Sequence, residues 1–320
     1  MKLSSLLVLF LLSVSLTASA QSQSPYDSFA SQAQEFYKQG EYLKAAESFS
    51  RAFASNNNLG RTDHRHTAAK CWAIIGQPDS AFYQLQKTVK AGFFQNHMVL
   101  TLDSQLVSLH NDARWPELVA LAKSQEPTRD PNLDSNLVNT LDSVYFTDQA
   151  DRSGINDVVQ KYGMESPEVR ALWKKISLQD SINLIKVKTI LDKQGWLGAD
   201  IVGQQGNSTL FLVIQHADLA TQEKYLPMMR DAVKNRKASA ADLALLEDRV
   251  ALGKGKKQIY GSQVGMSKKT GQYYVFAMED PANVDKRRAE VGLGPMIEYA
   301  KYFKIDWSLE QYEKDIALNR

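Results

Sequence analysis

The chain has 320 residues and weighs 35.9 kDa, a length that predicts about two globular domains. It carries 38 Lys and Arg against 36 Asp and Glu, a net charge of +2, and 43% of its residues are hydrophobic. That composition supplies a packed core, and the balanced charge excludes a protein that binds nucleic acid through a large cationic excess. A single cysteine, Cys71, excludes an intramolecular disulfide framework and a cysteine-based zinc cluster.

The first 20 residues have the pattern of a secretory signal peptide. Lys2 precedes an apolar run, Leu3–Leu16, and small residues follow it up to Ala20. The run is shorter than the roughly 20 apolar residues that span a bilayer. We therefore expect cleavage after Ala20 and a mature protein that is periplasmic or secreted and not inserted in the membrane. In that oxidising compartment Cys71 is expected to be a small buried hydrophobe.

Residues 21–125 are predicted to form a helical repeat domain. Two segments align when Gly40 is placed on Gly76, 36 residues later. In this alignment small residues coincide with small residues, and large residues coincide with large residues. The aligned pairs are Ala33 with Ala69, Phe36 with Trp72, Ala45 with Ala81, and Phe49 with Leu85. The segment FYKQGEYLKAAESFSRAF resembles the tetratricopeptide repeat family, whose period is about 34 residues. This resemblance implies helix pairs that either bind a protein or peptide partner on a concave face or support the packing of the next domain.

Asp63, His64 and His66 do not predict a metal site, because two histidines spaced i, i+2 on a helix point apart. We expect them to lie on a solvated surface. The stretch Gln125–Pro131, QEPTRDP, contains two prolines and mixed charges, which predicts a linker at 126–131. The second domain, 132–320, is expected to be mostly helical with a small β-hairpin, so the whole chain is predicted to be mainly α.

Charged residues continue the apolar face of the first predicted helix in this domain, 132–152. Its apolar stripe leads directly into Asp148 and Arg152. The next predicted helix carries Asp180 and Asn183 in the middle of its own apolar stripe. Burying a carboxylate costs several kcal/mol unless it is paired. Asp180 is therefore expected to have a partner, and Arg152 is the candidate.

Capping residues mark where the following helices begin. Ser166 precedes Pro167, the pattern of an N-cap followed by proline in the first turn. The stripe of that helix includes Trp173, which we expect to be in the core. The glycines between Gly195 and Gly206 predict a loop, with Ser208 capping the next helix.

The segment Leu210–Ile214 is apolar on every side, which predicts a helix at the centre of the domain. It ends in Gln215 and His216, and Asp218 caps the next helix. An interior helix that ends in a histidine can present the imidazole to a cavity for acid–base chemistry. The alternative is a core histidine that donates to a neighbouring carbonyl or to Asp180.

The C-terminal part is predicted to hold one helix, a hairpin and two closing helices. Ser239 resembles the start of a capping box for a helix through Leu252, which contains Arg249. The segments 258–264 and 272–278 alternate like the two strands of a hairpin. The closing helices are expected at 284–291 and 295–303.

Six motifs occur in one order along this domain: DQADR from 148, GW from 195, QHAD from 215, LEDRV from 246, QIYGSQ from 258 and RRAEVGLGP from 287. Together they resemble a bacterial family of uncharacterised domains, over about residues 133–305. Members of that family are often exported and often follow tetratricopeptide-like repeats. Ser262 stands where the family pattern has threonine and keeps the hydroxyl. The resemblance implies no activity, but it implies that the polar motifs belong to one site.

Three interpretations of these polar residues remain open, and binding is the one we favour. As a binding module, the domain would hold a polar small ligand with residues drawn from its motifs: Asp148, Arg152, Asn183, Gln215, Asp218, Arg249, Gln258, Tyr260 and Gln263. As a hydrolase or lyase acting on a cell-envelope glycan or peptide, it would use Asp180 as base or nucleophile and His216 as acid/base. As a structural network, the Asp, Arg and His residues would be sealed and bind nothing. The sequence has no dinucleotide fingerprint, P-loop or zinc-ligand signature, so we expect no cofactor and no metal.

Overall fold

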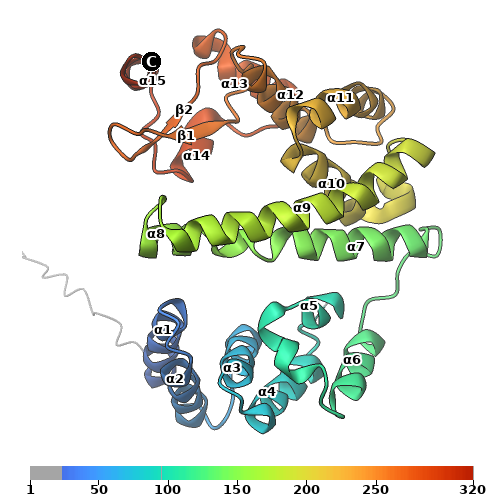
Figure 1. Cartoon of the computed structure of the whole chain (residues 1–320), viewed down its shortest axis with the longest axis vertical. Coiled ribbons are helices and arrows are strands. Elements are labelled where there is room, and N and C mark those ends of the chain that lie inside the picture. Colours follow the sequence, from blue (N-terminus) through green and yellow to red (C-terminus); the bar gives the residue numbers. More distant parts are fainter. Residues whose placement is uncertain (1–23, 95, 320) are drawn as a thin grey trace, which may run out of the picture. The chain divides into compact units, whose positions relative to one another are not determined.

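The computed structural model describes residues 24–94 and 96–319, and these are almost entirely helical (Figure 1). The predicted mainly α fold with a small hairpin is confirmed. The chain forms two compact units: unit 1 contains the described residues up to Phe93 and Ser108–Leu118, and unit 2 contains Phe94–Val107 and the chain from Val119 onward. The predicted signal peptide lies outside the described residues. None of the described helices combines the length and the apolar character needed to cross a membrane.

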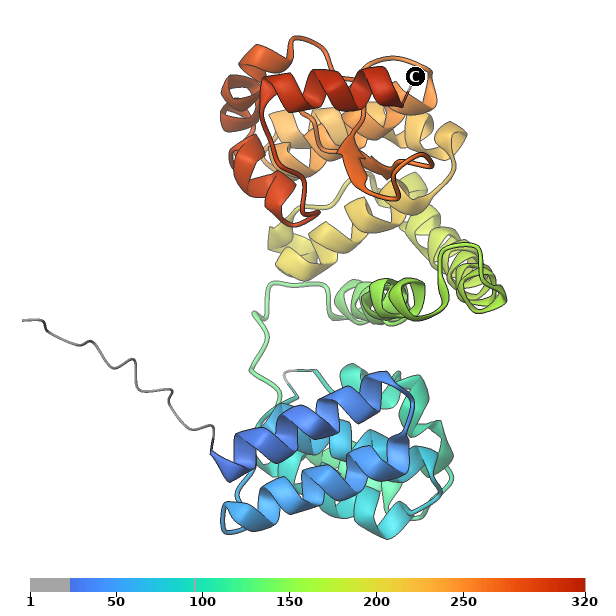
Figure 2. The same ribbon diagram turned by 90° about the vertical axis from the view of Figure 1, so that its left-hand side faces the viewer.

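Unit 1 is built from two helix pairs, which lie side by side in Figures 1 and 2. The helices are α1 (Pro25–Lys38), α2 (Tyr42–Ser55), α3 (Thr62–Ile74) and α4 (Pro78–Lys90). Gly40 and Gly76, at the turns within the pairs, have φ of 77° and 73°, a conformation that favours glycine. Ala33, Ala69, Ala45 and Ala81 are all fully buried where the paired helices approach. Positions 36 residues apart therefore occupy equivalent places.

Two predictions in unit 1 have opposite outcomes. The solvated position expected for His64 is wrong: this residue is 8% exposed, and its Nδ1 is 2.8 Å from the hydroxyl of Tyr26. The ring of His66 packs against Phe93. Cys71 is fully buried and free, as expected, and burial raises the pKa of its thiol to about 12.

The remaining elements follow in chain order. Between α4 and the main part of unit 2 come α5 (Met98–Thr101), the 3-10 helix η1 (Ser104–Leu109) and α6 (Trp115–Ser124). The main part contains α7 (Ser135–Gln149), η2 (Arg152–Gly154), α8 (Ile155–Tyr162), α9 (Pro167–Gln194), α10 (Ala199–His216), α11 (Leu219–Lys234) and α12 (Ala240–Gly253). It ends with β1 (Val264–Met266), β2 (Tyr273–Val275), η3 (Pro281–Asn283), α13 (Val284–Glu290), α14 (Met296–Lys301) and α15 (Leu309–Leu318).

Unit 2 has a large helical core and a smaller C-terminal one. The large core gathers buried side chains of α7, α9, α10, α11 and α12. Leu210 and Ile214 of α10 are fully buried in it, which confirms the central place predicted for this helix. The smaller core includes Val275, Met278 and Met296 and joins the hairpin to α13, α14 and α15.

Three of the predicted caps are confirmed, but the cap predicted at Ser208 and the glycine loop before it are wrong. Ser166, Asp218 and Ser239 each accept a backbone N–H at the start of α9, α11 and α12. α10 already begins at Ala199 and is kinked at Gly203, where φ is 72°, so that Ser208 lies inside the helix. The sequence showed the glycines but not that the chain resumes the helix after a single left-handed residue.

Two further expectations need correction. The hairpin is short, with Val264 opposite Val275 and Met266 opposite Tyr273, so most of the predicted first strand is a loop. We call Gln258–Gln263 the motif loop. Trp173, expected in the core, is 46% exposed, because the apolar stripe of α9 is covered only along part of its length.

Candidate functional site

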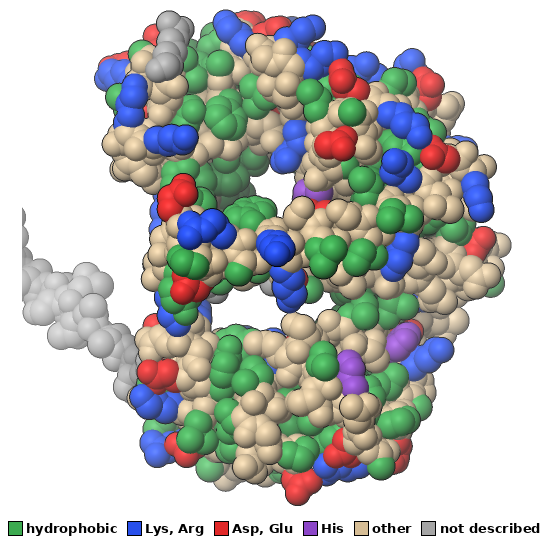
Figure 3. All heavy atoms as spheres, in the orientation of Figure 1, with side chains coloured by type: hydrophobic (Ala, Val, Ile, Leu, Met, Phe, Trp, Pro, Cys, Tyr) green, Lys and Arg blue, Asp and Glu red, His purple; other side chains and the backbone are tan. Residues whose placement is uncertain are grey.

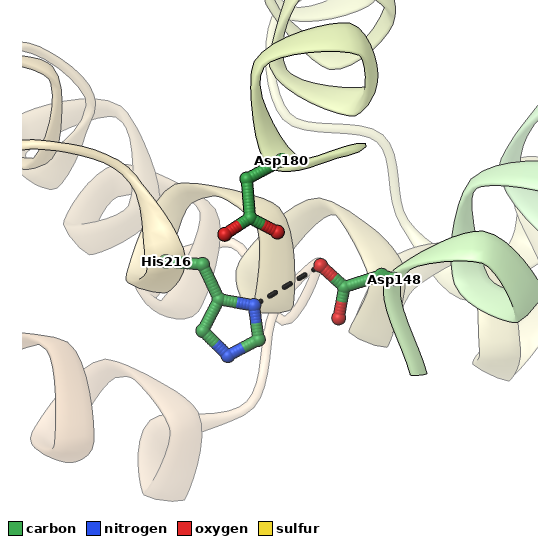
Figure 4. Close-up of side chains that lie close together, drawn as sticks. All are labelled: Asp148, Asp180 and His216. Atoms are coloured by element: carbon green, nitrogen blue, oxygen red, sulfur yellow. Dashed lines mark hydrogen bonds and ion pairs between the residues drawn. The ribbon is translucent and has the colours of Figure 1, made fainter. Parts of the chain in front are cut away.

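Four polar residues of unit 2 meet where three helices come together. Asp148 is near the end of α7, Arg152 opens η2, Asp180 is in the middle of α9, and His216 is the last residue of α10. Figure 4 shows the side chains of Asp148, Asp180 and His216 directed toward one another. We call these four residues the Asp-Arg-His cluster. The sequence places each of them at the end of an apolar segment or inside one, so helix packing brings them together.

Arg152 bridges the two carboxylates of the cluster. Its Nη2 donates to both carboxylate oxygens of Asp180 at 2.8 Å, which confirms the predicted pair. Its Nη1 donates to the backbone oxygen of Asp148 at 2.7 Å and lies 3.3 Å from a carboxylate oxygen of the same residue. A single guanidinium therefore faces two acidic side chains.

His216 is oriented by Asp148. Its Nδ1 lies 3.1 Å from a carboxylate oxygen of Asp148, the contact drawn as a dashed line in Figure 4. Neither of the partners predicted for a core histidine, a carbonyl or Asp180, takes this place. Gln149 donates to the other oxygen of Asp148 at 2.7 Å. The sequence analysis missed this pairing, because helical periodicity does not show which helices cross.

The electrostatics of the cluster fix which nitrogen of His216 carries a proton. Burial alone would raise the pKa of Asp148, but the hydrogen bond from His216 and the charges of His216 and Arg152 outweigh burial and lower that pKa. An ionised carboxylate only accepts hydrogen bonds, so Nδ1 is the donor, and Nε2 is an acceptor whenever Nδ1 carries the single ring proton. Nε2 has no hydrogen bond to any residue that the structure describes.

The cluster is not sealed from solvent. The side chains of His216 and Asp180 are 18% and 23% exposed, whereas that of Asp148 is 1% exposed. Figure 3 shows unit 2 hollowed between α9 and the part that carries the hairpin and α14, with a histidine and an acidic side chain at the rim. The exposed fractions of His216 and Asp180 show that these two side chains contact solvent.

Three residues predicted to bind a ligand have contacts within the helices of unit 2: Asn183 and Asp218 through their side chains, and Gln215 through its backbone. Asn183 is fully buried, and its side-chain oxygen accepts from Thr147 and Gln179, each at 3.0 Å. The backbone oxygen of Gln215 accepts from the side chain of Gln222. Asp218 caps α11 by accepting from the N–H of Thr221 at 2.7 Å.

The motif loop is fixed by a buried carboxylate that the sequence analysis did not single out. Asp248 of α12 is fully buried and accepts the backbone N–H groups of Ile259, Tyr260 and Ser262 at 2.6, 3.0 and 2.9 Å. The only signal for it in the sequence was its position in the LEDRV motif, beside Arg249.

The side chains of the motif loop are largely used within the loop. Gln258, predicted as a ligand residue, is fully buried and donates to the backbone oxygens of Gln263 and Phe276. Gln263 donates to the hydroxyl of Ser262. The phenol of Tyr260 is half-buried, and burial followed by the charge of Glu247 raises its pKa.

The cluster also offers ligands of the kind that divalent metals use. Asp148, Asp180 and His216 each present one ligand atom, and these atoms lie within 4.8 Å of one another. Carboxylates and imidazoles bind zinc and similar cations. Here Arg152 supplies the positive charge between the carboxylates, so a metal ion would have to displace its guanidinium.

Comparison with known proteins places these residues in one family. Residues 135–311, more than half of the chain, match the model of a family of unknown function (DUF6624). The chain belongs to this family. The Asp-Arg-His cluster, Arg249 and the motif loop all lie inside the DUF6624 region. Searches of the curated proteins and of the solved structures gave no match.

Proposed function

We propose that the DUF6624 region binds a small polar ligand in the hollow beside the Asp-Arg-His cluster. The observation that carries this proposal is the state of His216. Asp148 holds its Nδ1, while its Nε2 is an unused acceptor on a partly exposed ring. A partly exposed acceptor that the fold does not use is available to water or to a donor group of a ligand.

The surroundings of His216 indicate what such a ligand must offer. An acceptor nitrogen requires a donor, so the ligand needs a hydroxyl, amine or amide group. Asp180, 23% exposed, adds a second acceptor near the same place, held in position by Arg152. Because Arg152 and Asp148 fix both groups before any ligand arrives, little ordering is needed on binding.

The test uses His97 as a matched control. His97 is also 18% exposed and also has its Nδ1 on a carboxylate, that of Glu126 at 2.6 Å. Wild type, His216→Gln and His97→Gln are titrated with small hydroxy acids, amino acids and sugars, and complexes are detected by native mass spectrometry. We expect a bound compound whose affinity falls at least about tenfold in His216→Gln, equivalent to about 1.4 kcal/mol, and is unchanged in His97→Gln. Equal binding by all three proteins, or binding of no compound, contradicts the proposal.

A second candidate function is acid–base catalysis by a hydrolase or lyase that acts on a cell-envelope glycan or peptide. The observation that favours it is the same Asp148–His216 contact, because a carboxylate on Nδ1 leaves Nε2 able to take a proton from water or a hydroxyl. Asp180 is the candidate base or nucleophile. We expect turnover of envelope polymers to fall by about 100-fold or more in Asp148→Asn and in Asp180→Asn if the cluster is catalytic. Turnover unaffected by a substitution removes that residue from the mechanism.

Export and partner docking complete the proposal. The Leu3–Leu16 run supports secretion, and the 36-residue repeat supports a protein or peptide partner on unit 1. Mass spectrometry of the N-terminus of the mature protein tests the expected cleavage after Ala20.

A further inference from the structure

The guanidinium of Arg249 of α12 has no partner among the described residues. The residue is half-buried, and its Nε has no contact with solvent and no hydrogen-bond acceptor. Its side chain makes no hydrogen bond or ion pair with any residue that the structure describes. Arg152 and Arg288, by contrast, are paired: Arg152 with Asp180, and Arg288 with the backbone oxygens of Gly294 and Tyr260.

The side chains of Glu247, Asp248 and Tyr299 could pair with Arg249, but each already has another hydrogen-bond partner. The carboxylate of Asp248 is occupied by the N–H groups of the motif loop. Glu247 accepts from the Nε of Arg230 at 2.8 Å. The charge of Tyr299 affects the pKa of Arg249. The hydroxyl of Tyr299, however, donates to the backbone oxygen of Ser262 at 2.6 Å. The fold therefore keeps the Nε of Arg249 away from water without giving it an acceptor, which is unfavourable for a charged group.

Arg249 is on α12, which packs against α10, the helix that ends in His216. Burial is the largest cause of the lowered pKa of Arg249, and the positive charge of Arg152 lowers that pKa further. The two guanidiniums come from different elements, α12 and η2, and repel each other. A negative group near them relieves both the repulsion and the missing partner of Arg249.

The geometry points to Arg249 as the anchor of an oxyanion, a carboxylate or a phosphate, on the ligand. This inference rests on the ligand site proposed above and adds the charge of its ligand. A guanidinium presents parallel N–H groups that match two oxygens of a carboxylate or phosphate, and its charge strengthens both hydrogen bonds. Arg152 is already compensated by its two aspartates, so Arg249 contributes both the free hydrogen bonds and the uncompensated positive charge.

The test measures anion binding with inorganic phosphate and acetate as separate probes. Full-length wild type, Arg249→Gln and Arg249→Lys are titrated at constant ionic strength in chloride, and affinity is read by calorimetry and thermal unfolding. We expect at least one probe to bind wild type, at least about tenfold more weakly to Arg249→Gln, and with intermediate affinity to Arg249→Lys, which keeps the charge but not the two-pronged geometry. Arg236→Gln, an exposed arginine of the same unit, is the control and should bind as wild type does.

The outcome separates the two proposals. Equal binding by wild type and Arg249→Gln, or no binding of either anion to wild type, overturns the inference about Arg249. If neutral polar ligands still depend on His216 in that case, the proposed ligand site stands without the oxyanion. If phosphate or acetate depends on Arg249 while no ligand depends on His216, the oxyanion anchor stands and the proposed role of His216 fails. Stronger binding of phosphate or of acetate identifies which oxyanion the site prefers.

Discussion

The motif loop and the Asp-Arg-His cluster are both built around a buried carboxylate, but only one of them is complete. Asp248 is surrounded by three backbone N–H groups of the motif loop, and Gln258 is likewise fully used. In the cluster, Asp148 is also buried, yet the Nε2 of His216 and the nearby guanidinium of Arg249 have no partner among the described residues. Family motifs thus contain residues of two kinds. Those with every hydrogen bond satisfied hold the fold, and those left unsatisfied are candidates to meet a ligand.

The largest loss of stability is expected from Asp248→Ala. Alanine leaves three buried or part-buried N–H groups without their acceptor, so the free energy of unfolding should fall by about 3–5 kcal/mol. Asp231→Ala is the control, since Asp231 is exposed and its one ion pair within the described part of the chain is with Lys234, and it should cost less than about 1 kcal/mol. Urea unfolding measures both variants. If Asp248→Ala lowered the free energy of unfolding only slightly, the motif loop would not differ from the Asp-Arg-His cluster as a region that holds the fold.

Arg152→Gln should have the next largest effect. It leaves Asp148 and Asp180 without their cation, and we expect a loss of about 2–3 kcal/mol. The same variant should bind Zn²⁺ more tightly than wild type does. The ligand atoms of Asp148, Asp180 and His216 lie within 4.8 Å of one another, and in the variant no guanidinium competes with a metal ion for the carboxylates. Lys175→Gln, which removes an exposed ion pair with Asp151, is the matched control. Zn²⁺ binding that is the same in wild type and in Arg152→Gln would show that the guanidinium does not occupy the cation position.

Stability should depend on pH through Asp148. The folded pKa of Asp148 is lowered from its ordinary value of 3.8, so the unfolded state takes up protons first as the pH falls. The stabilisation is therefore present above about pH 4 and is lost as the pH falls through the folded pKa. Urea unfolding of wild type and Asp148→Asn from neutral to acidic pH should show a difference that shrinks below about pH 4. A difference that stays constant with pH would mean that Asp148 is not ionised by its contacts.

Arg249→Gln should have the smallest effect, and of the opposite sign. Removing an uncompensated half-buried charge should leave the free energy of unfolding unchanged or raise it by up to about 1 kcal/mol. Arg288→Gln is the comparison, because Arg288 is 2% exposed and donates to two backbone oxygens, and it should lose about 2–3 kcal/mol. Equal losses for the two variants would show that Arg249 also has a structural partner.

The sequence predicted those features that depend on one helix at a time. Ser166 and Asp218 indicate where helices begin, because their side chains accept hydrogen bonds from backbone N–H groups in the first turn. The apolar run at Leu210–Ile214 predicted a central helix from its composition alone. The pair of Arg152 with Asp180 was predicted because both interrupt apolar stripes and a buried carboxylate needs a cation.

Features that depend on how helices cross could not be predicted in this way. Nothing in the spacing of Asp148 and His216 shows that α7 and α10 bring them to 3.1 Å. The same limit explains why His64 was placed on the surface, since its partner Tyr26 lies on another helix. The alternation of Gln258–Gln263 looked like a strand, but Asp248 fixes that segment as a loop from a distance of more than ten residues in the chain.

The most direct test of the account is the protonation of the His216 ring, read from the ¹⁵N signals of the imidazole at about pH 8, above the ordinary histidine range. The account predicts a proton on Nδ1, none on Nε2, loss of this preference in Asp148→Asn, and a shift of the Nε2 signal when the bound ligand is added. The signals of His97 serve as the internal reference. A proton on Nε2 in the wild type, or an Nε2 signal that no ligand changes, would contradict the claim that His216 is held ready for a ligand.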